Sequence, residues 1–251
     1  MNKLDKLNDY YNKFNEDKRL LSRHGIVEFR VTTSFIDKYL KENDSIVDIG
    51  AGSGRYSVYY KNKGHEVLAV EPLSTNVGKI KRNDSQLKVL QASATNLNKV
   101  DKEYDVALMF GPMYHLLNKE DKIKAINEVR RIVKNNGLIF IAYLRSDYCL
   151  IKHGLLDNNF SDLNNNLLKD EIIDNDGLYC YVSDKYIEEI DKELNLKVID
   201  KFTQEGISDF IRNYLNKLND DEFENYIRYI IKMASDISIS SHIVEVIKNE
   251  K

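Results

Sequence analysis

Three glycines at alternate positions follow a short apolar segment and could form a binding site for a small polar ligand. The stretch 45–56 reads SIVDIGAGSGRY, which places Gly50, Gly52 and Gly54 between a predicted strand and a predicted helix. Glycine has no Cβ and tolerates positive φ, and the first N–H groups of a helix have no partner within that helix. The turn therefore predicts a crevice in which main-chain N–H groups face a small polar ligand.

The spacing of these glycines distinguishes between ligands. A dinucleotide-binding turn has the pattern G-x-G-x-x-G, whose third glycine would fall at Arg55, a bulky and charged residue. The pattern D-x-G-x-G-x-G that begins at Asp48 resembles instead motif I of the class I S-adenosylmethionine-dependent methyltransferases. The resemblance implies S-adenosyl-L-methionine as the cofactor and S-adenosyl-L-homocysteine as the product. It also implies cofactor contacts at Asp48, Gly50, Ala51, Gly52 and Gly54.

An acid follows the next predicted strand at a spacing that suits a ribose. The apolar run 65–71 (HEVLAVE) ends in Glu71, ~20 residues beyond the glycine turn, where a carboxylate commonly accepts hydrogen bonds from ribose hydroxyl groups. The resemblance implies that Glu71 binds the ribose, and Pro72 ends this strand beside the crevice. After the next strand, it implies adenine contacts from Ser93, where similar enzymes often have an acid, and from the backbone of Ala94.

A fourth strand-like run, 104–110, leads into the sequence GPMYHLL at 111–117. This stretch resembles motif IV of small-molecule and uncharacterised bacterial class I methyltransferases, which implies that Phe110 and Gly111 contact the cofactor. Methyltransferases that act on DNA amino groups have a polar residue at this position. Since Phe110 provides no acceptor for a target amine, the motif disfavours nucleobase N-methylation.

Catalytic side chains are harder to predict, because methyl transfer from a sulfonium depends mainly on the alignment of donor and acceptor. If the acceptor loses a proton, His115 is the first candidate base, followed by Tyr143 and His24. A histidine at position 115 can equally be a structural hydrogen-bonding residue. Cys149 and Cys180 lie outside any metal-ligand spacing, so no metal site is predicted.

Apolar runs and helical periodicity predict the elements that position these residues. Strands are expected at 46–50, 65–71, 87–91, 104–110, 138–144, 197–203 and 241–247, with helices at 54–62, 75–83, 119–133 and 183–194. This alternation predicts an α/β fold with a doubly wound parallel sheet and ligands at the carboxyl ends of its strands. The resemblance implies a Rossmann-like methyltransferase fold of seven mostly parallel strands, whose last strand is antiparallel and lies between the fifth and sixth.

Residues 1–44 are predicted as an N-terminal helical cap, and residues 45–251 as the Rossmann-like domain, with insertions at about 146–182 and 206–238. Two helices are expected in the cap, at 1–20 and 19–40; the apolar stripe of the first includes Tyr10, Tyr11 and Phe14. In the family, such leading segments commonly fold over the cofactor. Tyr10 and Tyr11 are therefore either lid residues that contact it or residues that pack the helix onto the domain. The first insertion either shapes a substrate pocket or is a surface excursion, and the second has two helical patterns and precedes the last strand.

Composition limits the partners. The chain has 37 basic and 40 acidic side chains, without a cluster of Lys and Arg interleaved with aromatic residues, so double-stranded nucleic acid is not an expected partner. The N-terminus is too polar for a signal peptide and no run approaches the ~20 apolar residues of a membrane span, so a cytoplasmic location is expected. The sequence leaves the oligomeric state open.

These features together predict a methyltransferase that moves a methyl group from S-adenosylmethionine to an unidentified, small-molecule acceptor by in-line displacement. Two alternatives stay open on sequence alone. A nucleotide-binding oxidoreductase is disfavoured by Arg55 in the glycine turn. A non-catalytic binding module that keeps the cofactor pocket is left open by Ser93.

Overall fold

The predicted strands pair into one sheet, which has nine strands within the part of the chain that the structure describes. The structure is a computed structural model, and it describes residues 3–13, 16–160, 169–174, 176–236 and 238–251. Seven strands follow the expected order across the sheet: β3 (Lys88–Leu90), β2 (Val67–Val70), β1 (Ile46–Ile49), β4 (Tyr104–Met109), β5 (Val133–Arg145), β9 (His242–Lys248) and β8 (Lys197–Thr203). Strand β9 is antiparallel to both β5 and β8, which confirms the predicted fold class.

Two further strands lie in the segment 146–182, for which the sequence predicted no strand. Strands β6 (Glu171–Ile173) and β7 (Cys180–Val182) form an antiparallel hairpin, and β7 pairs in parallel with the last two residues of β5. These are Leu144 and Arg145, which lie beyond the point where β4 ends. The helix α8 (Ser146–Cys149) and the π-helix η1 (Leu150–Leu156) connect β5 to this region. The hairpin thus extends the sheet past the carboxyl end of β4.

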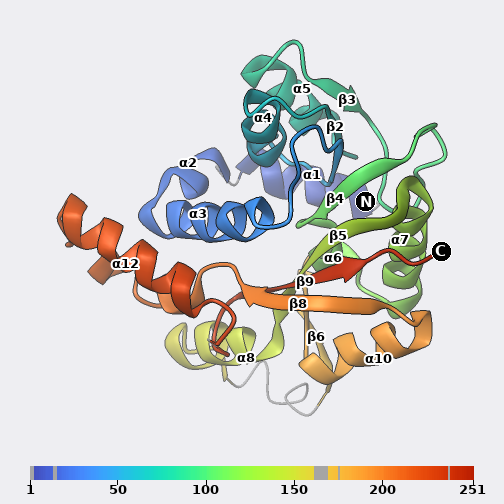
Figure 1. Cartoon of the computed structure of the whole chain (residues 1–251). Helices are drawn as coiled ribbons and strands as arrows, with labels where there is room; N and C mark the ends of the chain where they lie inside the picture. The colour runs from blue at the N-terminus through green and yellow to red at the C-terminus, as the bar shows by residue number, and fades with distance from the viewer. Residues whose placement is uncertain (1–2, 14–15, 161–168, 175, 237) are drawn as a thin grey trace.

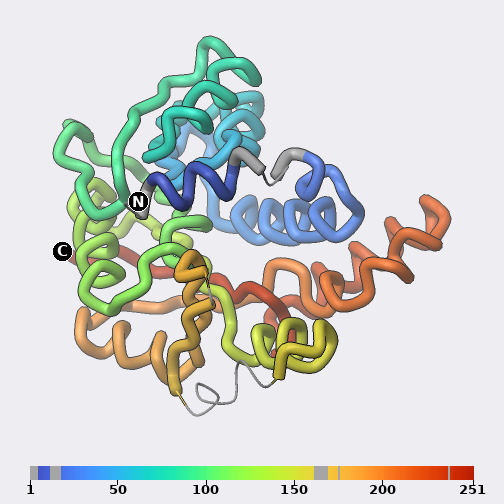
Figure 2. The backbone as a smooth tube through the Cα atoms, turned by 180° about the vertical axis from the view of Figure 1, so that it is seen from behind, coloured from blue at the N-terminus to red at the C-terminus, as the bar shows by residue number. Residues whose placement is uncertain are grey.

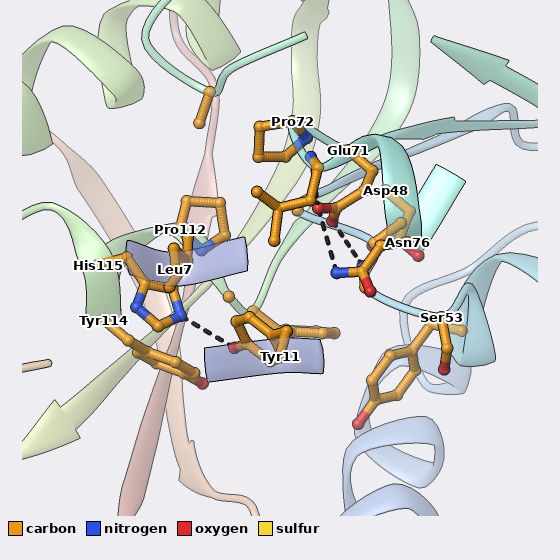
Figure 3. Close-up of a pocket in the computed structure, with 18 of the residues that line it drawn as sticks. Leu7, Tyr11, Asp48, Ser53, Glu71, Pro72, Asn76, Pro112, Tyr114 and His115 are labelled. Carbon is orange, nitrogen blue, oxygen red and sulfur yellow. Dashed lines mark hydrogen bonds between the residues drawn. The ribbon is translucent and has the colours of Figure 1, made fainter. Parts of the chain in front are cut away.

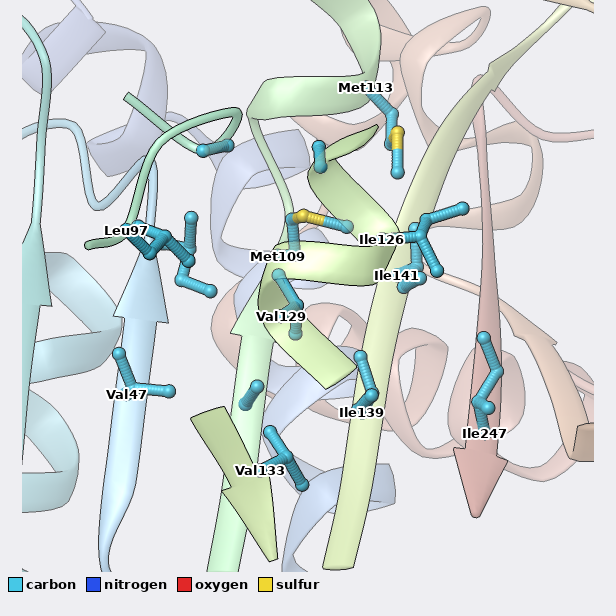
Figure 4. Close-up of a cluster of buried hydrophobic side chains, with 14 of the residues drawn as sticks. Val47, Leu97, Met109, Met113, Ile126, Val129, Val133, Ile139, Ile141 and Ile247 are labelled. Atoms are coloured by element: carbon cyan, nitrogen blue, oxygen red, sulfur yellow. The ribbon is translucent and has the colours of Figure 1, made fainter. Parts of the chain in front are cut away.

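Helices cover both faces of the sheet (Figure 1). On one face, α3 (Arg23–Asp37), α4 (Arg55–Asn62), α5 (Ser74–Asn83) and α12 (Asp220–Met233) contribute buried side chains to a common core. On the other face, α7 (Lys119–Ile132) and α10 (Asp184–Leu194) pack against β1, β4 and β5 (Figure 4). Burial of both faces explains why most residues of β1, β2 and β4 are apolar, rather than only alternate ones.

The N-terminal segment has three helices rather than the two expected. After α1 (Lys3–Lys13), α2 (Glu16–Leu21) ends just before Ser22, whose hydroxyl accepts a hydrogen bond from Gly25 N–H and caps α3. Helix α3 contributes Val27, Val31 and Ile36 to the main core, whereas α1 places Leu7 against Leu73 and Leu178. In Figure 2, α1 crosses between α5 and the β6–β7 hairpin. Phe14 lies outside the described residues, and the division at residue 44 stays a prediction.

The second insertion contains the 3-10 helix η2 (Gly206–Asp209), the short α11 (Arg212–Leu215) and α12. Helix α12 begins at a capping box in which Asn219 and Glu222 exchange hydrogen bonds with each other's backbone N–H groups. The short helix α6 (Pro112–His115) follows β4 directly. No helix among the described residues combines the length and apolar character needed to span a membrane.

Candidate functional site

A cavity of about 370 Å³ opens at the carboxyl ends of β1, β2 and β4, below α1 (Figure 3). Most of the residues predicted to contact a cofactor line it: Tyr11, Asp48, Gly50, Ala51, Gly52, Glu71, Pro72, Ser93, Ala94, Phe110 and Gly111. His115 lines the same cavity, while Gly54, Tyr10 and Tyr143 do not. The elements of a doubly wound sheet thus bring together residues from four separate parts of the sequence.

The glycine turn has the left-handed backbone that its sequence predicts. The φ angles are 72° at Gly50, 58° at Gly52 and 84° at Gly54. A Cβ at Gly50 would lie 2.6 Å from Pro112 Cδ, and one at Gly54 would lie 3.1 Å from Ile80 Cγ1, so these two glycines permit close packing. A Cβ at Gly52 would meet no atom within 4 Å, so Gly52 leaves space in the cavity.

The N–H groups of Gly50, Ala51 and Gly52 are engaged within the protein, whereas the expectation for the first N–H groups of the following helix stays a prediction. Those of Gly50 and Ala51 donate to the Val70 carbonyl oxygen at 2.8 and 3.1 Å, and that of Gly52 donates to Glu71 Oε2 at 2.9 Å. The reason is that β2 pairs beside β1 up to its last residue, and Glu71 follows immediately. At these three residues the turn therefore offers a ligand the space beside Gly52 rather than unpaired N–H groups.

Two buried carboxyl groups flank the turn. Asp48 Oδ2 accepts a 2.5 Å hydrogen bond from Ser57 Oγ of α4, and burial raises the pKa of Asp48 to about 6. Glu71 Oε1 accepts hydrogen bonds from Leu73 N at 3.0 Å and from Asn76 Nδ2 at 3.3 Å. Burial raises the pKa of Glu71 to about 7, although these donors oppose the shift. Glu71 is thus fixed at the end of β2, with its carboxyl group at the cavity wall (Figure 3).

The loop after β3 forms a tight turn. Ser93 Oγ lies 3.0 Å from Thr95 Oγ1 and accepts a hydrogen bond from Thr95 N, while the Ser93 carbonyl accepts one from Asn96 N at 2.9 Å. Ser93, Ala94 and Thr95 all line the cavity. The serine hydroxyl therefore stabilises its own turn, as is usual for this residue type.

His115 connects three segments rather than standing free. Its Nδ1 lies 2.8 Å from the Leu178 carbonyl oxygen, which can only accept, so Nδ1 is the donor. Nε2 of the neutral ring then accepts from Tyr11 Oη at 3.0 Å (Figure 3). Both ring nitrogens are used to hold α1 and the β6–β7 hairpin to α6. This geometry fits the structural interpretation of His115 better than a catalytic base, whose lone pair would have to be released by Tyr11.

The other predicted bases lie elsewhere. Tyr143 is fully buried in the core beneath α7 and α10, and its hydroxyl has no hydrogen-bond partner among the described residues. Burial raises the pKa of Tyr143 well above its usual value, so neither position nor acidity supports a catalytic role. His24 and Tyr10 line a second, adjoining cavity. Burial, aided by Arg212, lowers the pKa of His24 to about 4.

Several lining residues were not predicted. Tyr114 lies in the GPMYHLL stretch but was not singled out, and four others belong to no motif: Arg19, Glu28, Gln204 and His242. Arg19 Nη1 donates to Glu28 Oε2 at 2.7 Å; although burial opposes ionisation, Arg19 lowers the pKa of Glu28 to about 2. Only His242 had a signal in the sequence. Because the last strand was expected to run antiparallel, its first residue must lie at the same edge as the carboxyl ends of the other strands. Within the described residues, no group of three or more His, Cys, Asp or Glu side chains could hold a metal ion.

Comparison with known proteins finds a family model that matches part of the chain. Residues 46–137 match the family model described as a methyltransferase domain. The chain is 27% identical over 165 residues to an uncharacterised protein of Methanocaldococcus jannaschii, covering 65% of this chain and 62% of that protein. It is 27% identical over 124 residues to glycine/sarcosine N-methyltransferase of Parasynechococcus marenigrum, covering 46% of this chain and 44% of that enzyme. The chain thus spans about half the length of these curated relatives.

A solved structure supports the fold over nearly the whole chain. The crystal structure of 1,6-didemethyltoxoflavin-N1-methyltransferase from Burkholderia thailandensis, with bound 1,6-didemethyltoxoflavin and S-adenosylhomocysteine, is similar with a TM-score of 0.59. The sequences are 13% identical, and the similarity covers 98% of this chain and 88% of that one. At this identity the similarity concerns the fold alone.

The topology and the site therefore define a Rossmann-like methyltransferase fold. Together with the match of residues 46–137 to a methyltransferase domain, they show that this part of the chain is similar to class I S-adenosylmethionine-dependent methyltransferases. The cofactor of that family is S-adenosylmethionine. The residues present fit it, because Gly52 leaves open space and Glu71 has a buried carboxyl group at the wall of the same cavity.

Proposed function

We propose that this protein transfers a methyl group from S-adenosylmethionine to a small-molecule acceptor by in-line displacement. The observation that supports the proposal is the cavity at the ends of β1, β2 and β4, where the open side of Gly52 and the Glu71 carboxyl group meet. Two similar proteins support the proposal. One is named glycine/sarcosine N-methyltransferase, and the structure of the Burkholderia thailandensis enzyme contains 1,6-didemethyltoxoflavin, so the printed descriptions of both refer to small molecules.

The proposed cofactor contacts follow the walls of the cavity. Glu71 accepts hydrogen bonds from the ribose hydroxyl groups, and the turn 93–95 meets the adenine. Gly52 provides the space for the amino-acid end of the cofactor, and Asp48 positions the turn through Ser57. Tyr11 closes the cavity from α1 through its bond to His115.

The contribution of this chain to catalysis is then one of positioning. Bound S-adenosylmethionine supplies a methyl group on a positively charged sulfur, and displacement leaves the electron pair of the carbon–sulfur bond on that sulfur. Holding an acceptor in line with this methyl group can account for ~7 to 11 kcal/mol of the barrier. Phe110, just after β4, and Tyr114, in α6, line the cavity on the side where we propose that an acceptor approaches.

Isothermal titration calorimetry tests the proposal directly. We expect saturable binding of S-adenosylmethionine and S-adenosylhomocysteine, and no binding of NAD, since Arg55 occupies the position of the third dinucleotide glycine. Binding of NAD alone would replace the proposal by an oxidoreductase. A crystal structure with S-adenosylhomocysteine would then show whether the ribose hydroxyl groups lie at Glu71.

A further inference from the structure

A second cavity, of about 450 Å³, adjoins the first. The two cavities share five lining residues: Tyr11, Arg19, Glu28, Tyr114 and His242. The second cavity lies between α1, α3, α8, the β6–β7 hairpin and the loop after β8, so both sequence insertions contribute to its wall. Ser93, Ala94 and Thr95 line the first cavity and not the second, so the two cavities meet away from the proposed adenine turn. An acceptor in line with the methyl group would lie on that side.

The wall of this cavity is acidic and aromatic. Five carboxyl groups line it, against two arginines, and six tyrosines surround them. Both arginines have carboxylate partners, since Arg19 pairs with Glu28 at 2.7 Å and Arg212 Nε donates to Asp209 at 2.6 Å. Among the described residues, Asp174 and Asp176 make no ion pair. A carboxylate or phosphate ligand would find no uncommitted cation here, whereas an ammonium group would be attracted by the acids and by the tyrosine rings.

The wall also contains a buried nitrogen atom, Nε2 of His24, that can accept a hydrogen bond. Ser22 Oγ donates to the Arg19 carbonyl oxygen at 2.5 Å, so it accepts from His24 Nδ1 at 2.8 Å. The other nitrogen of the neutral ring, Nε2, then carries a lone pair. It has no hydrogen-bond partner within the described residues, and the carboxylate oxygen Oδ1 of Asp209, at 3.8 Å, is too distant for a hydrogen bond. His24 is 8% exposed, so this lone pair is desolvated unless the cavity holds an N–H or O–H donor.

His242 lies where the two cavities meet, and a carboxylate orients it. Its Nδ1 is 3.1 Å from both Glu205 Oε1 and Oε2. Glu205 Oε1 is fixed in turn by the N–H groups of Ser241 and His242, at 3.0 and 3.2 Å. Because the carboxylate accepts from Nδ1, the neutral ring has its lone pair on Nε2, which makes no hydrogen bond within the described residues. A histidine held in this way by a carboxylate is the usual arrangement of a general base.

We propose that the second cavity receives the methyl acceptor, that this acceptor is a small amine, and that His242, oriented by Glu205, takes a proton from its nitrogen. The inference rests on the proposed function and adds the substrate class to it. An N–H bond of the bound ammonium breaks, the proton forms a bond to His242 Nε2, and the freed lone pair on nitrogen becomes the nucleophile. The proton later leaves His242 for solvent. Glu205 is a positioning residue in this scheme.

The groups around His242 suit this task. Burial disfavours its charged form and Arg19 repels it, but the carboxylates of Glu205 and Glu28 outweigh both and raise the pKa of His242. The Tyr114 ring, 5.2 Å away between centroids, packs against the imidazole from α6. Both ring nitrogens of His115, in contrast, form hydrogen bonds, to Tyr11 and to Leu178. His242 rather than His115 therefore has a lone pair available.

A binding experiment tests the acceptor class. The wild-type protein is first titrated with S-adenosylhomocysteine by calorimetry, and absence of binding at this step refutes the proposed function itself. The saturated complex is then titrated with three probes of equal shape: 2-phenylethylamine, 2-phenylethanol and phenylacetate. We expect the amine to bind at least about tenfold more tightly than the acid, a difference of ~1.4 kcal/mol. Equal binding of all three, or tighter binding of phenylacetate, would overturn the inference while leaving the proposed function intact.

NMR titration of the histidine ring protons tests the base. The His242 signal is assigned by its loss in His242→Gln, and His65, whose Nδ1 contacts only the Asp44 carbonyl oxygen, is the internal control. We expect the pKa of His242 to lie above the ordinary value for histidine, to fall in Glu205→Gln, and to shift when 2-phenylethylamine is added, whereas the His65 signal should not respond to the amine. A His242 pKa that is not raised above the ordinary value for histidine and does not respond to the amine rejects the assignment, even if Glu205→Gln fails to fold.

Discussion

The two sides of the site are built in different ways. On the cofactor side, the glycine turn, Glu71 and the turn 93–95 each follow directly after a parallel strand, and main-chain hydrogen bonds hold them. On the acceptor side, His24, Glu205 and His242 come from a helix, a loop and an antiparallel strand, and side chains hold one another. The first side depends on backbone geometry at a few positions, and the second on a network of charges.

This contrast indicates how each side can change. A binding surface made by strand ends tolerates few substitutions, because each residue has a required φ or a required place in the sheet. A surface made by paired side chains on insertions can change its charge or shape while the sheet stays intact. Single substitutions at the strand ends should therefore weaken cofactor binding strongly. Single substitutions among the paired side chains that hold α1 should change the position of this helix only slightly.

The largest expected effect is that of Gly52→Asp. The new Cβ and carboxylate would enter the open space beside the turn, where the amino-acid end of the cofactor is proposed to lie. We expect binding of S-adenosylmethionine to weaken by at least about 100-fold, or ~2.7 kcal/mol, by calorimetry.

Gly64→Asp is the matched control, because Gly64 also has positive φ, at 99°, and open space at its Cβ, but lies outside the cavity. Both substitutions impose the same type of backbone strain. If Gly64→Asp weakened binding as much as Gly52→Asp, or if folded Gly52→Asp bound normally, the turn would not be the site.

A smaller effect is expected for Glu71→Ala. Loss of hydrogen bonds to a charged acceptor should weaken S-adenosylmethionine binding by about 1.5 to 3 kcal/mol. Glu66→Ala, at an exposed glutamate that pairs with Lys88 and Lys102, provides a control for removal of a carboxylate near the same strand. An unchanged dissociation constant in Glu71→Ala would refute the ribose assignment.

The pH dependence of binding gives a further test of Glu71. Hydroxyl donors favour the charged carboxylate, and burial has raised the pKa of Glu71 to about 7. Affinity for S-adenosylmethionine should therefore be full above pH 8 and decline as pH falls below 7, by up to about tenfold per unit. Glu71→Gln should remove this dependence; a wild-type affinity that is constant from pH 8 to 5.5 would contradict the assignment.

The same contrast explains what the sequence could predict. The cofactor side was predictable because glycine spacing and strand-end acids are local signals. The alternation of helices and strands predicted a doubly wound parallel sheet, and the resemblance implied the place of the antiparallel last strand. Even there, the N–H groups of Gly50, Ala51 and Gly52 proved to be engaged, since a motif gives positions but not hydrogen-bond partners.

The acceptor side was less predictable for two physical reasons. The strands of the β6–β7 hairpin have three residues each, too few for a periodic pattern within an Asn- and Asp-rich segment. Side chains along β5 point alternately to the two faces of the sheet. Phe140 and Ala142 lie on one face, and Tyr143 lies on the other with Ile139 and Ile141, beneath α7 and α10. The sequence shows this alternation, but only the packed fold shows which face adjoins the cavities.

The smallest expected effect is that of Tyr11→Phe. This change removes the neutral hydrogen bond to His115 Nε2, while the ring contacts with Tyr10 and His115 stay possible. Such a bond contributes ~0.5 to 1.5 kcal/mol, so global stability should change little. Because this bond ties α1 to α6, amide hydrogen exchange in α1 should accelerate by about 2- to 10-fold while the strands of the sheet stay protected. Tyr214→Phe, at an exposed tyrosine of α11, should leave exchange in α1 unchanged. Equal exchange of α1 in wild type and Tyr11→Phe would mean that the apolar contact of Leu7 with Leu73 and Leu178, rather than the Tyr11–His115 bond, holds this helix over the cavity.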